Sequence, residues 1–283
     1  MTVKIITDTS CDLPPELEGE LKRLGVKAIP FLFHFGLEEH WDKTMSVKEF
    51  LARAAKTWPT TAAPSVGAFI EAFRECVVAG DQVVCITITS KHSATYSTAV
   101  LASQEFPAGQ VAVVDSLELS LGQGLLVLAA ARAAREGKSL EQVVETVRAL
   151  HKRLHFFLAF ETVEYLVKGG RASRLTGALA SVLKIRPIIA LVDGELTLLE
   201  KPRGREAARQ KLLQMALSHF PAEMVGVAHI DNEAGARELL KELSAQTGYP
   251  AEKILLVDVG LALAAHGGPG TVGVVVASKV AGD

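Results

Sequence analysis

Short apolar runs rich in valine and isoleucine alternate with longer segments of helical periodicity along the first half of the chain. Runs of roughly four to eight such residues between turn residues are typical of buried strands, and apolar residues spaced three or four positions apart are typical of helices. The expected strands are residues 3–7, 26–35, 82–88 and 110–115, and the expected helices are residues 15–24, 46–56, 66–79, 97–105, 122–136 and 139–154. This alternation predicts a three-layer α/β/α domain with a mainly parallel sheet.

The second half has a different pattern. Asp193-Gly194 separates two apolar runs, which is a β-hairpin signal. The expected strands are residues 156–160, 186–192, 196–201, 224–230, 253–257 and 272–278, and the expected helices are residues 205–218 and 233–247. A hairpin combined with βα units predicts a two-layer α/β domain with a mixed sheet. The predicted fold is therefore α/β with two domains, residues 1–155 and 156–283.

Hydroxyl side chains gather in the loops that follow the first-half strands. These loops are residues 8–12, 60–65 and 89–96. In open α/β sheets, ligands bind beyond the carboxyl ends of the strands, so we expect the three loops to converge on one site. Small neutral donors together with backbone N–H groups at helix starts suit a single anion, such as a carboxylate or a phosphate. The donors are Thr61, Ser65, Ser90, Ser93, Thr95 and Ser97.

The same hydroxyls have a simpler interpretation as helix N-caps. We expect Ser65 and Ser97 to be caps, and for any single hydroxyl the cap interpretation is favoured. The anion pocket rests on the three loops taken together.

Composition narrows the class of protein. The chain has 283 residues, 49% of them apolar and 22% charged, which excludes wholesale disorder. Its net charge of −2 argues against a main role in wrapping nucleic acid or coating an anionic membrane. The mean hydropathy of +0.26 is high for a soluble protein and is consistent with a large core or an internal apolar cavity.

Sequence features favour the cytoplasm. Cys11, Cys76 and Cys85 are far apart and lack CxxC spacing, so neither a disulfide framework nor a structural zinc site is expected. No apolar run reaches the roughly 18 residues of a membrane-spanning helix, and the N-terminal apolar stretch is too short for a signal peptide.

Several catalytic motifs are missing from the sequence. It has no GxxxxGK[ST] loop for ATP and no GxSxG nucleophile elbow. The pair Gly122 and Gly124 lacks the third glycine of a dinucleotide fingerprint and is interpreted as close helix packing. The eight histidines show no HExxH or HxH spacing, so no metal site is expected. We assign no catalytic residue and no cofactor.

Two glycine-rich segments in the second half are further candidates for ligand contact. His266 precedes Gly267-Gly268-Pro269-Gly270, and glycines beside a histidine let the backbone approach a ligand that the imidazole can bond. Gly169 and Gly170 stand between Lys168 and Arg171. Taken alone, the His266 segment is better interpreted as a strained turn with a surface histidine. The Lys168–Arg171 segment has the same two interpretations, a turn with two solvated charges or a backbone approach to a ligand with a fixed arginine.

Charged residues have similar alternatives. Asp8 and Asp12 could form an acid/base pair, but a hydrogen-bonding role for Asp8 and a capping role for Asp12 are favoured. Lys201, Arg203 and Arg205 form either a solvated patch or a docking site for an acidic partner.

Taken together, six segments resemble the DegV family of bacterial fatty-acid-binding proteins. Each motif alone is weak, but six in order over nearly the whole chain are specific. They are TDTSCDLP (7–14), like TDSxxDLP; TAAPS (61–65), like TSQPS; ITITSKHSATY (86–96), like ITISSxLSGTY; VDS with Ser120, Gly122 and Gly124, like VxDSxxxSxGxG; LVKGGRAS (166–173), like LxKGGRIS; and HGGPG (266–270), like HxGPG.

The resemblance implies two α/β domains with a long acyl chain, such as palmitate, stearate or oleate, buried between them. It also implies a non-enzymatic lipid carrier that presents the fatty acid carboxylate to a separate ATP-dependent fatty acid kinase subunit. The expected carrier is a cytoplasmic monomer that binds no nucleic acid and can touch a membrane transiently.

The resemblance also implies roles for residues. Thr61 and Ser93 are the expected carboxylate contacts. The other expected ligand contacts are His266, Gly170, Arg171, Ser65 and Thr95, and the expected partner contacts are Arg203 and Arg205. Three departures from the family pattern, Ala62 for Ser, His92 for Leu and Ala94 for Gly, leave head-group geometry and chain-length preference open.

Two other functions fit the sequence. An enzyme acting on a small phosphorylated or carboxylated metabolite would use Asp8 or His266 as its base, and a small polar pocket would favour it. A regulatory lipid sensor would use the same apolar pocket as the carrier, so the sequence cannot separate those two.

Overall fold

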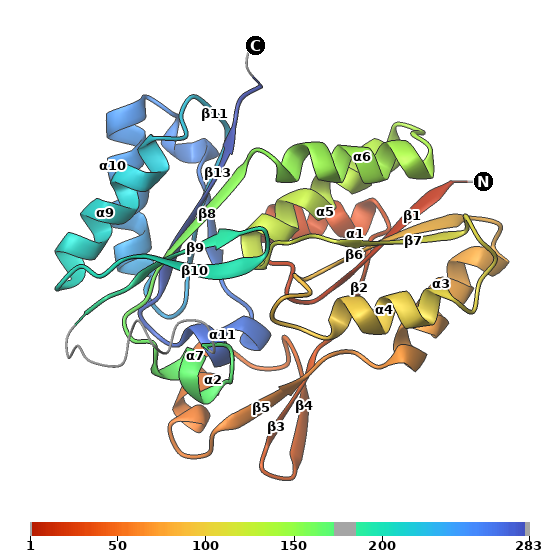
Figure 1. Cartoon of the computed structure of the whole chain (residues 1–283), viewed down its shortest axis with the longest axis horizontal. Coiled ribbons are helices and arrows are strands. Elements are labelled where there is room, and N and C mark those ends of the chain that lie inside the picture. The colour runs from red at the N-terminus through yellow and green to blue at the C-terminus, as the bar shows by residue number, and fades with distance from the viewer. Residues whose placement is uncertain (1, 173–184, 281–283) are drawn as a thin grey trace. The chain divides into compact units, whose positions relative to one another are not determined.

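The computed structural model describes residues 2–172 and 185–280, and its contacts divide the chain into two compact units (Figure 1). The first unit contains residues 1–44 and 61–152, and the second contains residues 45–60 and 153–283. Residues 45–60, which the sequence places in the first domain, thus belong to the second unit. Ser173, the last residue of one family-like motif, lies outside the described residues.

A four-stranded parallel sheet forms the centre of the first unit, with strand order β2-β1-β6-β7. Its strands are β1 (Val3–Asp8), β2 (Lys27–Ile29), β6 (Gln82–Thr87) and β7 (Val111–Asp115). The two inner strands, β1 and β6, are buried along most of their length, as the runs of valine and isoleucine predict for a sheet covered on both faces. The two edge strands, β2 and β7, are only partly buried.

Helices cover both faces of this sheet (Figure 1). One group is α1 (Pro15–Arg23), α5 (Ser120–Arg135) and α6 (Leu140–His151), and the other is α3 (Val66–Val78) and α4 (Thr95–Ser103). Phe69 and Phe73 on α3 are fully buried against the sheet. The three-layer prediction is confirmed, and Gly124 packs closely as expected, because a Cβ there would lie 2.5 Å from the carbonyl oxygen of Asp12.

Pro30 changes the expected second strand. The run 26–35 is two strands, β2 and β3 (Leu32–Phe35), because proline donates no ladder hydrogen bond. A strand that the pattern did not predict, β4 (Glu38–Trp41), pairs with β3. Residues expected as a loop form β5 (Pro59–Ala62), in a small sheet of order β4-β3-β5.

The second unit is built on a six-stranded mixed sheet of order β10-β9-β8-β13-β11-β12, as predicted. Its strands are β8 (Leu154–Ala159), β9 (Ile188–Val192), β10 (Glu195–Glu200), β11 (Ala222–His229), β12 (Leu255–Asp258) and β13 (Val272–Ser278). Only the β11–β12 pair is parallel within this sheet. Asp193 and Gly194 both have positive φ (47° and 81°), the geometry that a tight hairpin requires.

Two long helices, α9 (Arg205–Leu217) and α10 (Glu233–Thr247), pack on this sheet through a core that includes Leu212 and Leu239. Three shorter helices complete the unit: α2 (Val47–Ala54), α7 (Glu164–Lys168) and α11 (Leu261–Gly267). α11 packs against both α2 and α7, which explains why residues 45–60 belong here. Among the described residues, no helix is both long and apolar enough to cross a membrane.

Candidate functional site

A pair of hydroxyls stands at the start of α4. The oxygens of Ser93 Oγ and Thr95 Oγ1 are 2.8 Å apart, and the Thr95 backbone N–H donates to Ser93 Oγ at 3.3 Å. Thr95 is fully buried, whereas Ser93 is half-buried. When Thr95 donates both its N–H and its O–H to Ser93, the Ser93 proton is left to point outward. The pair can therefore offer a neutral donor to an anion.

Ser65 is a helix cap, as predicted. Its Oγ accepts the N–H of Ala68 at 3.2 Å, and its own O–H remains a donor. Because α3 and α4 pack together, Ser65 and the Ser93–Thr95 pair occupy the N-termini of two neighbouring helices. We call Ser65, Ser93 and Thr95 the hydroxyl cluster. Thr61 lies half-buried on β5 rather than in a loop.

The prediction that Ser97 is a cap is wrong. α4 begins two residues earlier, at Thr95, and the Ser97 hydroxyl donates to Ala94 O at 2.8 Å inside the first turn. A capping role for Asp12 is also wrong, because α1 begins after Pro14 with no side-chain cap. Asp12 instead accepts the Ser120 hydroxyl at 2.7 Å.

Asp8 is the centre of a buried polar network at the end of β1. Its Oδ2 accepts the Ile88 N–H at 2.8 Å, and its Oδ1 accepts the Ser10 N–H at 3.1 Å and the Gln123 amide at 3.2 Å. The Ser10 hydroxyl contacts Asp8 Oδ1 and donates to Gln123 Oε1 at 2.9 Å. Burial raises the pKa of Asp8, although these hydrogen bonds act in the opposite direction.

Both carboxylate oxygens of Asp8 thus hold loop backbone and α5 in place, and the side chain is fully buried. This confirms the expected hydrogen-bonding role. It also argues against the alternative in which Asp8 acts as a base, because a base must reach its substrate.

A second buried acid, Glu118, was missed by sequence reasoning. It lies in the turn between β7 and α5, where Leu117 and Ser120 both have positive φ (53° and 47°). Its carboxylate is 3.6 Å from His151 Nδ1, and a Cβ on Gly122 would fall 2.3 Å from Glu118 Oε2. Burial raises the pKa of Glu118. The sequence signal for this site is a glycine one helical turn after an acid, here Gly122 four residues after Glu118.

In the second unit, Gly170 has a structural explanation. It follows α7 with φ +73°, its N–H donates to Val167 O at 3.1 Å, and the next N–H, of Arg171, donates to Leu166 O at 2.9 Å. This is a Schellman cap, which favours glycine at that position. The Arg171 side chain turns back to donate to Gly169 O, and burial lowers the pKa of its guanidinium.

Two further glycines let rings pack against backbone. A Cβ on Gly169 would lie 2.2 Å from His266 Nδ1, and a Cβ on Gly268 would lie 2.5 Å from the Tyr165 ring. Direct contact therefore joins the Lys168–Arg171 segment to the His266–Gly270 segment. Arg171 and His266 are 95 residues apart in the sequence. We call Gly169, Gly268, His266 and Tyr165 the glycine cluster.

Trp58, which belongs to the segment of residues 45–60, packs against the glycine cluster. Its ring centroid is 5.1 Å from that of Tyr165, and Lys168 Nζ lies 5.0 Å over its face. The contact is a cation–π interaction added to ring packing. Trp58 was not singled out by the sequence, because a lone tryptophan carries no spacing signal.

The two arginines expected to contact a partner differ. Arg205 donates to both oxygens of Glu161, at 3.0 and 3.2 Å, and Arg186 binds the same carboxylate. These bonds lower the pKa of Glu161, against the effect of burial. Arg203 is exposed and forms no ion pair within the described part of the chain. No group of three or more metal-ligating side chains occurs among the described residues.

Comparison with protein families gives a match over nearly the whole chain. The model of the DegV family matches residues 2–279. A curated relative, a DegV domain-containing protein of Caldanaerobacter subterraneus subsp. tengcongensis, is 32% identical over 280 residues, which cover 96% of this chain and 97% of that protein. A second, from Deinococcus radiodurans, is 30% identical over 284 residues, covering 97% and 98% of the two chains.

Solved structures give the same result. A DegV family protein from Thermus thermophilus, described by its fatty acid binding, has a TM-score of 0.90 at 31% identity and covers 99% of this chain and 100% of its own. A stearic-acid-binding protein from Eubacterium ventriosum has a TM-score of 0.84 at 29% identity and covers 98% of each chain. A Thermotoga maritima structure reported to reveal a fatty acid binding function has a TM-score of 0.83 at 29% identity, covering 99% and 100%.

Proposed function

Because this chain belongs to the DegV family, we propose that it binds a long-chain fatty acid and presents the carboxylate to a separate ATP-dependent kinase subunit, which forms the acyl-phosphate. The observation that carries the first part is the full-length likeness, with a TM-score of 0.90, to a Thermus thermophilus protein described by its fatty acid binding. The kinase partner follows from the motif resemblance.

The hydroxyl cluster supports a carboxylate head group in particular. Ser93 and Ser65 each accept a backbone N–H, and each keeps an O–H that can be donated. A neutral donor holds a carboxylate less tightly than an arginine fork does, so the oxygen stays available to accept a phosphoryl group. Each CH₂ of the acyl chain that is removed from water adds about 0.8 kcal/mol to binding, so the apolar tail supplies most of the affinity.

The head-group contacts come from the hydroxyls of the first unit. Thr61 and Ser93 bind the carboxylate, and Ser65 and Thr95 position them. In the second unit, the motif resemblance assigns ligand contact to His266, Gly170 and Arg171. Arg203 and Arg205 contact the kinase subunit. The carrier works as a monomer without a cofactor, and phosphoryl transfer belongs to the partner.

The direct test is mass spectrometry of small molecules released by denaturing the purified protein. We expect one fatty acid per chain, with palmitate, stearate and oleate as the leading candidates. If no lipid is released and added oleate and palmitate fail to bind, the carrier function is wrong.

Two serines four residues apart provide a matched pair of variants. Ser93→Ala removes the outward donor and should weaken oleate binding about tenfold, the effect of roughly one hydrogen bond to a charged group. Ser97→Ala removes a hydroxyl already bonded to Ala94 O and should leave the affinity unchanged. Equal effects of the two substitutions would contradict the head-group assignment.

The kinase step has its own test. Purified oleate-loaded protein, incubated with ATP and the candidate kinase subunit from the same organism, should yield acyl-phosphate, trapped as a hydroxamate. Arg203→Ala should reduce the rate without changing oleate affinity. An undiminished rate would remove Arg203 from the proposed interface.

A further inference from the structure

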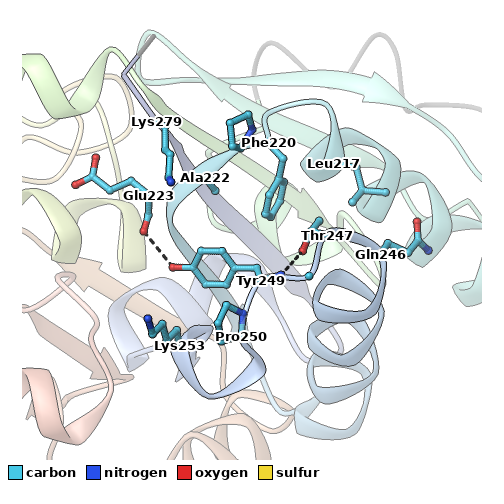
Figure 2. Close-up of a pocket in the computed structure, with 12 residues that line it drawn as sticks. Leu217, Phe220, Ala222, Glu223, Gln246, Thr247, Tyr249, Pro250, Lys253 and Lys279 are labelled. Carbon is cyan, nitrogen blue, oxygen red and sulfur yellow. Dashed lines mark hydrogen bonds between the residues drawn. The ribbon is translucent and has the colours of Figure 1, made fainter. Parts of the chain in front are cut away.

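The second unit contains an open pocket of about 710 Å³ that includes none of the residues assigned above (Figure 2). It lies between the segment that joins α9 to β11 and the segment that follows α10. Its lining includes Phe220, Pro221, Glu223, Tyr249, Lys253 and Lys279. The volume is within the range of small-molecule sites, about 300–1,000 Å³.

The walls of this pocket are of mixed polarity and include two aromatic rings. The rings of Phe220 and Tyr249 meet edge to face, with centroids 6.2 Å apart and an interplanar angle of 81°. The prolines Pro221 and Pro250 flank them. Such walls favour a ligand with an apolar or aromatic body.

Several polar groups of the pocket are already used. The Tyr249 hydroxyl donates to Glu223 O at 3.0 Å, and Thr247 Oγ1 donates to Leu243 O and accepts the Tyr249 N–H at 3.1 Å. The Glu223 carboxylate is bound by Arg153 at 2.6 Å, and the same guanidinium nitrogen donates to Ser278 O at 2.7 Å. The one carboxylate of the pocket is therefore neutralised from outside it.

Two lysines supply the remaining charge. Lys253 and Lys279 come from segments 26 residues apart (279 − 253), and in the view of Figure 2 the Tyr249 ring lies between them. Their backbones are anchored to the pocket wall, since Lys279 N–H donates to Pro221 O at 2.9 Å and Lys253 N–H donates to Pro250 O at 3.0 Å. Neither ammonium group forms an ion pair with another described residue.

We propose that this pocket is a second binding site, for a small organic anion that carries a phosphate or carboxylate group on an aromatic or similarly flat apolar body. The anionic group meets Lys253 and Lys279, and the body packs on Phe220 and Tyr249. The site is independent of the fatty acid proposal, because the two share no residue.

An NMR titration of the ¹⁵N-labelled protein, saturated with oleate, tests this with phenyl phosphate as the probe. Saturable shifts are expected at residues 246–253 and 279. Inorganic phosphate, which lacks the ring, and benzyl alcohol, which lacks the charge, should each bind at least five times more weakly.

Variants at exposed lysines provide the control. Lys253→Gln and Lys279→Gln should each weaken phenyl phosphate binding about fivefold, whereas Lys241→Gln, on the same unit but outside the pocket, should not. All three side chains are exposed, so folding is not at risk. The proposal is overturned if no saturable shift appears at these residues, if the three variants bind alike, or if the shifts seen without oleate vanish when oleate is added.

Discussion

The strand-end loops of the first unit and the glycine cluster of the second unit are held in place by different physical means. In the first unit, hydrogen bonds within a buried polar network around Asp8 hold the strand-end loops, and the hydroxyl cluster forms a further hydrogen-bonded pair. In the second unit, rings packed against glycines and against one another do the same work: His266 on Gly169, Tyr165 on Gly268, Trp58 on Tyr165, and His155 stacked on His219 at 3.6 Å.

This difference determines how each unit responds to change. A hydrogen-bonded network is sensitive to the loss of one donor or acceptor and to the protonation of its acid. A ring on a glycine is sensitive to a single added methyl group, because packed interiors have no spare volume.

Gly268→Ala should be the most damaging. The new Cβ would lie 2.5 Å from the Tyr165 ring, and the backbone has φ +73°. Overpacking costs about 1–3 kcal/mol, and a non-glycine residue at positive φ with extended ψ (165°) costs about 1–3 kcal/mol, so the free energy of unfolding should fall by about 3 kcal/mol. Urea denaturation measures it.

Gly204→Ala provides the control for Gly268→Ala. Gly204 has φ +86°, and no atom lies within 4 Å of the position that an added methyl group would take, so only the conformational cost applies. Equal losses for the two variants would mean that the Tyr165 contact contributes nothing and that ring packing does not define the second unit.

Asp8→Asn should have the next largest effect. The amide places a donor where the carboxylate accepts, so a buried N–H of Ile88 or Ser10 loses its partner at a cost of about 2 kcal/mol. The cost should shrink as pH rises. The pKa of Asp8 is raised in the fold, so the wild type is stabilised below the unfolded pKa of 3.8 and loses that stability as pH rises through the folded pKa.

Asp81 offers a control of opposite sign. It accepts two hydrogen bonds from Thr2, which lower its pKa, so its contribution is present above the unfolded pKa and is lost as pH falls. Denaturation of Asp8→Asn, Asp81→Asn and wild type between pH 2 and 8 should give difference curves of opposite slope. The Asp81 contribution should change below the unfolded pKa of 3.8, and the Asp8 contribution should change above it. Parallel curves would show that Asp8 does not titrate in this way.

The same contrast explains what could be predicted from the sequence. Local signals were sufficient for the strands β1 and β6, the Asp193-Gly194 hairpin and the Ser65 cap, because each depends on neighbours in the chain. The parallel order of the sheet followed from the alternation of strands with helices. The Asp8–Gln123 hydrogen bond joins residues 115 apart, and the packing of α11 on α2 recruits residues 45–60 to the second unit. Such long-range contacts leave no periodic pattern, so they were missed.

Local competition accounts for the smaller errors. Pro30 splits one apolar run into two strands. α4 begins at Thr95, two residues before the predicted start, and the buried Thr95 hydroxyl is hydrogen-bonded to Ser93. The pattern does not predict α11, because its alanine-rich turns merge with glycines. The motif resemblance names the Lys168–Arg171 and His266–Gly270 segments but gives no physical reason for them to meet. The structure supplies that reason, because the His266 ring packs where a side chain on Gly169 would lie.

His155→Phe should change the pH dependence of stability more than its magnitude. Burial lowers the pKa of His155 to about 4, with a further contribution from His219, whose own pKa is also lowered. The stacked pair therefore contributes stability that is present above the unfolded pKa of about 6.5 and is lost as pH falls toward 4. Phenylalanine keeps a ring in the stack and does not ionise.

The expected result is a shallower loss of stability between pH 6.5 and 4 in the variant, with similar stability at pH 8, measured by urea denaturation at each pH. An unchanged slope would mean that burial and His219 do not lower the pKa of His155 in the folded state. The second unit would then depend less on ring packing than the geometry indicates.

The smallest effect on binding is expected from the two tryptophan variants. Their fluorescence distinguishes ligand contact in the second unit from contact in the first. The chain has two tryptophans: Trp58 packs on Tyr165 beneath Lys168, while Trp41 is 50% exposed on β4 of the first unit. If the glycine cluster takes part in fatty acid binding, oleate should shift the emission of Trp41→Phe, which retains Trp58, and leave Trp58→Phe unshifted. Phenylalanine preserves the ring contact and weakens the cation–π interaction by only about 0.5 kcal/mol, so oleate affinity should change less than about threefold. A shift confined to Trp58→Phe would instead couple the ligand to the β3–β4 hairpin and leave the glycine cluster a structural element.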